Sequence, residues 1–156
     1  ITANKEWLFG LIDYEFIINN KDNISYCYYG FAENSMNDLW YFLELLTQKN
    51  DDLYFSCAEE GPTSFFYIQN LDNEKIRFIH ISNRVQKPIQ IINGLFQIHQ
   101  DFIISKYHFV KQFYDAIRQP IINTRIENLD DPLGIEEFEQ LNKDSDIIKK
   151  YLEKNK

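Results

Sequence analysis

The sequence contains few of the residues that interrupt secondary structure, glycine and proline, and few cysteines that could form disulfides. Among 156 residues there are five glycines, four prolines and two cysteines. So few turn-forming residues argue against a loop-rich scaffold, and so few cysteines argue against a fold held by disulfides. Cys27 and Cys57 lie inside apolar runs without the spacing of a metal site, so we expect reduced thiols in the core. A chain of this length can fold without such staples.

Long apolar runs and targeting signals are lacking as well. No stretch of 18 consecutive apolar residues occurs, and no basic segment is followed by a short apolar one. The sequence therefore predicts neither a membrane span nor an export signal, and we expect a cytoplasmic protein.

Motifs for catalysis are also missing. There is no G-x-S-x-G nucleophile turn and no G-x-x-x-x-G-K phosphate loop. His80, His99 and His108 have no partner four residues away and no zinc-ligand spacing. We accordingly expect no enzyme activity, no metal and no cofactor.

What the sequence does contain is aromatic and acidic. Thirteen Phe and ten Tyr contribute to 44% hydrophobic residues, a composition typical of large side chains packed on a sheet. The net charge is −8 and the pI is near 4.8. A protein with this net negative charge repels nucleic acids and anionic membranes and attracts a basic partner.

The pattern of apolar residues predicts an α+β fold. Residues 53–58, 63–70 and 75–83 form short runs rich in Phe, Tyr and Ile, which predict three antiparallel strands. Residues 7–18 and 24–31 predict a hairpin. Residues 89–92 and 95–104 predict a further strand, or a pair of strands broken at Asn93 and Gly94. Helical periodicity covers residues 36–48 and residues 105–118, where Pro120 is expected to end the second helix. We expect one antiparallel sheet of about five to six strands with helices packed on it and a C-terminal helical tail.

Composition changes near the end of the chain. We expect residues 1–126 to form the α+β domain and residues 127–156 to be an acidic helical extension of the same domain, with a boundary near Asp131 and Pro132.

Charge is unevenly distributed along the chain. Residues 1–60 hold eleven acids and three bases, whereas residues 61–126 hold four acids and eight bases. Several of the early acids fall at predicted strand ends or turns and could gather into a patch that steers a basic partner. The alternative is that loops simply carry charge. The candidate partner-binding residues are Asp13, Glu15, Glu33, Asp51, Asp52, Glu59 and Glu60.

A predicted strand leads into a predicted helix with paired aromatics from Phe102 to Ile117. This unit resembles the closing unit of small bacterial immunity proteins, which accompany contact-dependent growth inhibition toxins and other polymorphic toxins. The likeness extends over residues 53–118, whereas the acidic tail after Glu127 departs from the shorter family members. The resemblance implies a cytoplasmic immunity protein that binds a cognate toxin domain, a basic nuclease, and occludes its active site or substrate groove.

Two other classes stay open. One is a non-catalytic adaptor or structural protein whose tail mediates assembly, including assembly into a homo-oligomer. The other is a small hydrolase that uses His80 or His99 beside a carboxylate.

Overall fold

The computed structural model describes residues 2–8, 11–20, 23–29, 36–57, 63–83, 96–122 and 145–156. In these segments the chain forms two antiparallel sheets and three helices, so the predicted α+β class is confirmed. The elements are β1 (Thr2–Leu8), β2 (Leu11–Asn20), β3 (Asn23–Tyr29), α1 (Met36–Gln48), β4 (Leu53–Cys57), β5 (Thr63–Asn70), β6 (Lys75–Asn83), β7 (Phe96–Ser105), α2 (Lys106–Ile122) and α4 (Asp146–Lys154).

The strands are divided between two sheets, which corrects the prediction of one sheet of about five to six strands. The first has the order β1-β2-β3 and the second the order β4-β5-β6-β7. The chain passes through α1 between β3 and β4, and β3 packs against β4 and β7 without joining their ladder. Each sheet is a meander of neighbouring strands, the simplest antiparallel connection.

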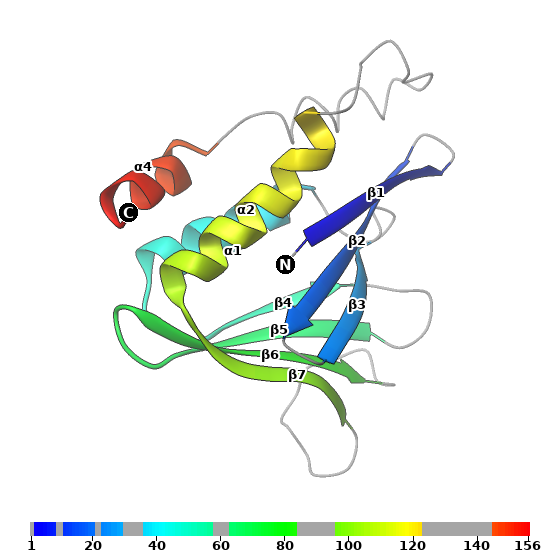
Figure 1. Ribbon diagram of the computed structural model, residues 1–156, viewed down its shortest axis with the longest axis horizontal. Coiled ribbons are helices and arrows are strands. Elements are labelled where there is room, and N and C mark those ends of the chain that lie inside the picture. The colour runs from blue at the N-terminus through cyan, green and yellow to red at the C-terminus, as the bar shows by residue number, and fades with distance from the viewer. Residues whose placement is uncertain are drawn as a thin grey trace.

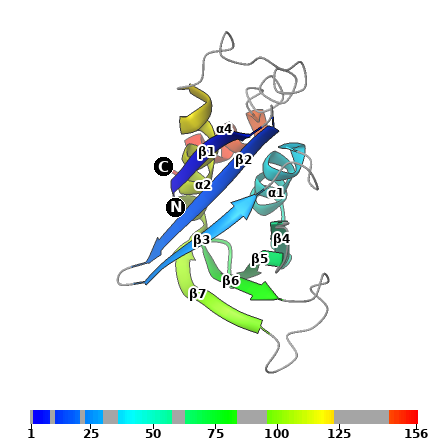
Figure 2. The ribbon, with the colours of Figure 1, turned by 90° about the vertical axis from the view of Figure 1, so that its right-hand side faces the viewer.

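Helices α1 and α2 cover one face of the four-stranded sheet, while the three-stranded sheet stands across the side of the same core (Figure 1). Figure 2, turned by 90°, shows the three-stranded sheet in front of α2, with α1 beside it. Helix α4 packs on α1 and α2 at their far side from the three-stranded sheet.

The helix α1 has the predicted bounds, and its apolar stripe of Leu39, Leu43 and Leu46 is fully buried. Helix α2 is longer than predicted, because it continues through Pro120 to Ile122. A proline removes one backbone donor, and in the last turn of a helix this interrupts little of the hydrogen-bond ladder. The buried Ile117 holds the preceding turn against the core.

Phenylalanine rings fill the space between the sheets and helices. Phe113 of α2 stacks on Phe16 of β2 at 4.9 Å and meets Phe66 of β5 edge-on at 6.1 Å. Phe66 in turn contacts Phe78 of the next strand at 5.3 Å. Such offset and edge-on arrangements are the favoured ones for aromatic pairs. One aromatic cluster therefore joins both sheets to α2.

Candidate functional site

The outer face of the four-stranded sheet, which points away from the helices, is partly apolar and exposed. Side chains alternate between faces along a strand, so the neighbours of the buried core residues lie on this face. The exposed fractions of Tyr54, Ile98 and Ile103 are 63%, 59% and 62%. Beside them, Arg77 binds Asp101 through two parallel hydrogen bonds of 2.7 Å. An arginine and an aromatic residue among exposed aliphatic side chains are typical of protein interfaces.

A smaller cluster lies on the same face. Phe65, Ile79 and Ile81 are buried, and the half-buried Tyr67 packs against them. Tyr67 stands opposite the exposed Tyr54 in the β4–β5 register. The exposed side chains of this face therefore lie beside a small cluster of buried apolar side chains.

Four exposed acids lie where this sheet meets the end of α1, and we call them the acidic corner: Asp51, Asp52, Asp72 and Glu74. Asp52 accepts hydrogen bonds from the Tyr67 hydroxyl at 2.8 Å and from the Asn70 backbone N–H at 3.0 Å. The hydroxyl stays protonated, because burial and the bond to Asp52 raise the pKa of Tyr67.

The β5–β6 turn supplies the second half of the acidic corner. The Asp72 carboxylate accepts bonds from the backbone N–H groups of Glu74 and Lys75 at 2.8 and 2.7 Å. These bonds lower the pKa of Asp72, so its negative charge is maintained. The amide of Asn50 donates to the Asn73 side chain at 2.9 Å and ties the turn to the end of α1.

A buried lysine, Lys106, fixes the end of α1 beside the acidic corner. The Lys106 side chain is 3% exposed, and its ammonium donates to the Lys49 carbonyl at 2.9 Å and to Asn50 Oδ1 at 3.1 Å. Burial lowers the pKa of Lys106. A cation that reaches the carbonyl groups after the last turn of α1 also complements the helix dipole. The corner is therefore held in place by the first residue of α2.

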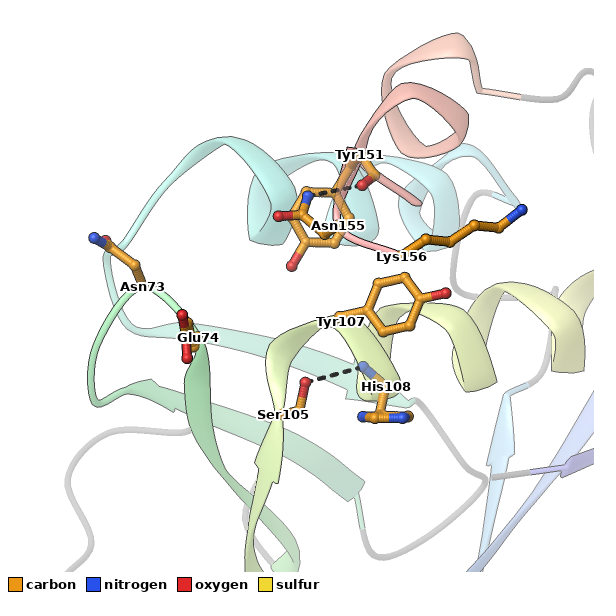
Figure 3. Close-up of a pocket in the computed structure, with 8 residues that line it drawn as sticks. All are labelled: Asn73, Glu74, Ser105, Tyr107, His108, Tyr151, Asn155 and Lys156. Atoms are coloured by element: carbon orange, nitrogen blue, oxygen red, sulfur yellow. Dashed lines mark hydrogen bonds between the residues drawn. The ribbon is translucent and has the colours of Figure 1, made fainter. Parts of the chain in front are cut away.

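A pocket of about 410 Å³ opens next to the acidic corner, between the β5–β6 turn, the start of α2 and the end of α4 (Figure 3). Its lining includes Glu74 from the turn, Tyr107 and His108 from α2, Tyr151 from α4 and Asn155, the C-cap of α4. The rings of Tyr107 and His108 meet edge-on with centroids 5.5 Å apart.

A cluster of serine and histidine side chains lies between the two sheets. Ser25 Oγ is 2.9 Å from His80 Nδ1, and the His80 ring lies 4.9 Å from that of His99, which itself bonds Ser82 at 2.7 Å. His99 is the extra residue of a β-bulge, because His80 pairs with Gln100 and the next residue of β6 pairs with Ile98.

This cluster has the residue types of a nucleophile and its base, yet the pair of Ser25 and His80 is enclosed, while Ser82 and His99 are partly buried. His80 is 0% exposed and Ser25 is 6% exposed. Burial and the neighbouring His99 lower the pKa of His80 to about 3, so its ring stays neutral at pH 7. In the described arrangement Ser25 is closed to substrate, and the pair acts as a polar link between the sheets.

Neither a metal site nor a membrane-spanning helix is found in the part of the chain that the structure describes. In the described segments, no three His, Cys, Asp or Glu residues gather as they would around a metal ion. None of the helices seen there is both long and apolar enough to cross a membrane.

Of the predicted partner-binding residues, the structure places Asp51 and Asp52 together on the exposed corner. Asp13 and Glu15 lie in β2, opposite Glu6 and Asn4 of β1, and their side chains lie outside the description. Glu33, Glu59 and Glu60 fall outside the described residues, as does the predicted boundary near residue 131.

Asp72 and Glu74 were not among the residues predicted from the sequence. Both belong to the segment with an excess of basic residues, so counting charge along the chain assigned them to the wrong group. The local sequence did contain a signal for the turn. Asp72 accepts hydrogen bonds from the backbone N–H groups two and three residues later, and an Asp in this position is typical of a turn. That they lie beside Asp51 depends on the pairing of strands and on the contact between Asn50 and Asn73.

Comparison of the chain with protein-family models, with curated proteins and with solved structures finds no match. The functional interpretation therefore rests on the geometry described above and on the resemblance of residues 53–118.

Proposed function

We propose that this chain is a cytoplasmic immunity protein, which binds a cognate toxin domain with a basic surface and blocks its active site or substrate groove. The observation that carries the proposal is the continuity of two surfaces. Asp52 of the acidic corner bonds Tyr67, and Tyr67 pairs with the exposed Tyr54 on the outer sheet face. Fixed carboxylates therefore adjoin exposed aromatic and aliphatic side chains.

Such a surface suits a basic nuclease for a physical reason. Carboxylates that are already held by hydrogen bonds lose little side-chain entropy on binding, and they can occupy positions that substrate phosphates would take. The adjacent tyrosine and isoleucine side chains provide apolar area that excludes water from the contact. Charge speeds association, and the apolar anchors slow dissociation.

The proposal is tested by co-expression with the C-terminal domain encoded by the gene immediately upstream. We expect cells that produce this chain to survive and the two proteins to purify together. Survival at control levels despite folded, abundant protein would contradict the proposal.

The charge argument is tested with Asp51→Lys, because the Asp51 side chain is exposed while its backbone carbonyl makes the local bond to Asn70. Association should slow by about tenfold or more at low salt and by less at high salt. Glu153→Lys, on the exposed side of α4, makes the same change of charge away from the corner and is the matched control. Equal effects of the two substitutions would contradict a specific role for the acidic corner.

A further inference from the structure

The pocket beside the acidic corner has the lining of a cation site. We propose that it binds a guanidinium group, namely the side chain of an arginine on the partner protein. The identity of the partner rests on the proposed function, whereas recognition of guanidinium by the pocket is a property of this chain alone.

Glu74 is the anionic group of the pocket. Its backbone N–H donates to Asp72, and its carbonyl accepts from the backbone N–H of Lys106 at 2.7 Å. The main chain is thus fixed on both sides, while the carboxylate makes no hydrogen bond or ion pair with any described residue. A carboxylate with both oxygens available is the preferred partner of a planar guanidinium fork.

Neutral acceptors stand across the pocket from Glu74. The Asn155 side-chain amide donates an N–H to the Tyr151 carbonyl at 2.8 Å, and this bond orients the amide so that its oxygen points into the pocket (Figure 3). The Tyr151 hydroxyl points to the same side. Both residues belong to the C-terminal end of α4, where the helix dipole favours a cation.

Aromatic faces complete the lining. Tyr107, His108 and Tyr151 contribute three rings, two of which meet at an interplanar angle of 74°. A guanidinium plane stacks on such rings more favourably than an ammonium group does, because it is flat and weakly hydrated. Carboxylate, neutral acceptors and rings together therefore favour arginine over lysine.

Two positive groups near the pocket, those of Lys106 and Lys156, are directed away from Glu74. Lys106 turns its ammonium to Lys49 and Asn50, and the Lys156 side chain runs away from Glu74 with its ammonium on the far side (Figure 3). At the start of α2, the N–H groups of Lys106 and His108 already donate to Glu74 and to Ser105 Oγ. These bonds reduce the attraction that a helix N-terminus offers to an anion.

The test is an NMR titration of the purified chain with Nα-acetyl-arginine amide. We expect saturable shifts of the ring signals of Tyr107, His108 and Tyr151, with a dissociation constant on the order of 1–10 mM for so small a probe. Glu74→Gln should weaken binding about fivefold or more, since it removes the charge-assisted bond. Tyr107→Leu should also weaken it, whereas Glu153→Gln, which removes the same charge outside the pocket, should leave it unchanged.

Three results would overturn the inference: no saturable shift at these rings, equal affinity after Glu74→Gln in a chain whose other signals are unmoved, or equal shifts with the uncharged Nα-acetyl-norleucine amide. Tighter binding of Nα-acetyl-lysine amide would overturn the choice of arginine. A positive titration in a chain that fails to protect cells would support the pocket and contradict the immunity function. A chain that protects cells but gives no saturable titration would contradict the guanidinium site and leave the immunity function supported.

Discussion

The two faces of the four-stranded sheet carry similar residues in different environments. On the inner face, Phe66 and Phe78 are 0% exposed and belong to one aromatic cluster with α2. On the outer face, Phe65 and Ile79 are buried, but Tyr54 and Ile103 remain more than half exposed. The sequence pattern places apolar residues on both faces of the sheet, so hydrophobicity alone does not tell which face is buried in the core. The inner face therefore belongs to the core, whereas the exposed side chains of the outer face are open to contact with a partner.

The largest effect should come from the inner face. Phe66→Ala removes a ring that contacts Phe16, Phe55, Phe78 and Phe113, and it should lower the free energy of unfolding by about 3–5 kcal/mol. Urea denaturation followed by circular dichroism measures the change. A loss below about 1 kcal/mol would show that the inner face is not the stabilising one.

His80, also on the inner face, should make the fold sensitive to acid. Its pKa is about 3 in the folded chain because the ring is buried beside His99, and 6.5 is the ordinary value. Between these pH values the unfolded state binds a proton that the folded state does not bind, so stability falls as pH falls. From pH 7 to pH 5 the loss should be about 2 kcal/mol.

The matched pair for this prediction is His80→Gln, which can keep a hydrogen bond to Ser25, and His108→Gln, at an exposed position on α2. Urea denaturation at several pH values should show a flatter dependence for the first variant only. The same steep dependence in both variants would show that His80 is not responsible.

The docking of α4 should have an intermediate effect. Ser145 is the N-cap of this helix: its hydroxyl accepts from the Ile148 backbone N–H at 3.3 Å and donates to Glu44 of α1 at 2.6 Å. Ser145→Ala should cost about 1 kcal/mol. The substitution should accelerate hydrogen exchange more in α4 than in β6, which would place the lost stability in α4. Equal acceleration in both elements would argue against a local effect of the cap.

The smallest effect on stability should come from the outer face. Tyr54→Ala should change the free energy of unfolding by less than about 1 kcal/mol, because the side chain is 63% exposed. The same substitution should weaken partner binding by about tenfold or more if Tyr54 is an anchor. Isothermal titration calorimetry measures the affinity, and a large loss of stability with unchanged affinity would reverse the assignment of the two faces.

Local patterns predicted much of this fold. The apolar spacing from Met36 to Gln48 gave the bounds of α1, and the aromatic runs with their turn residues gave β4, β5 and β6. These signals are contained within one element or one turn. The division into two sheets was not predictable in the same way, because it depends on how β3 packs against β4 and β7.

The candidate site was predictable only in part, for the same reason. Asp51 and Asp52 were found because they end a helix and precede a strand, whereas Glu74 joins them through a contact between Asn50 and Asn73, 23 residues apart. The link between Ser25 and His80 spans 55 residues and two sheets. Neither association leaves a pattern in the local sequence.

The most direct test of the proposed binding surface is hydrogen exchange of the purified chain, alone and mixed with the C-terminal domain encoded by the gene immediately upstream, which is the partner that the proposed function expects. The account predicts that binding slows exchange in residues 51–56, 67–77 and 98–103, which carry the acidic corner and the outer sheet face, and leaves the middle of α1 unchanged. Slowed exchange confined to the three-stranded sheet or to the exposed side of α4, with none in those three segments, would contradict it.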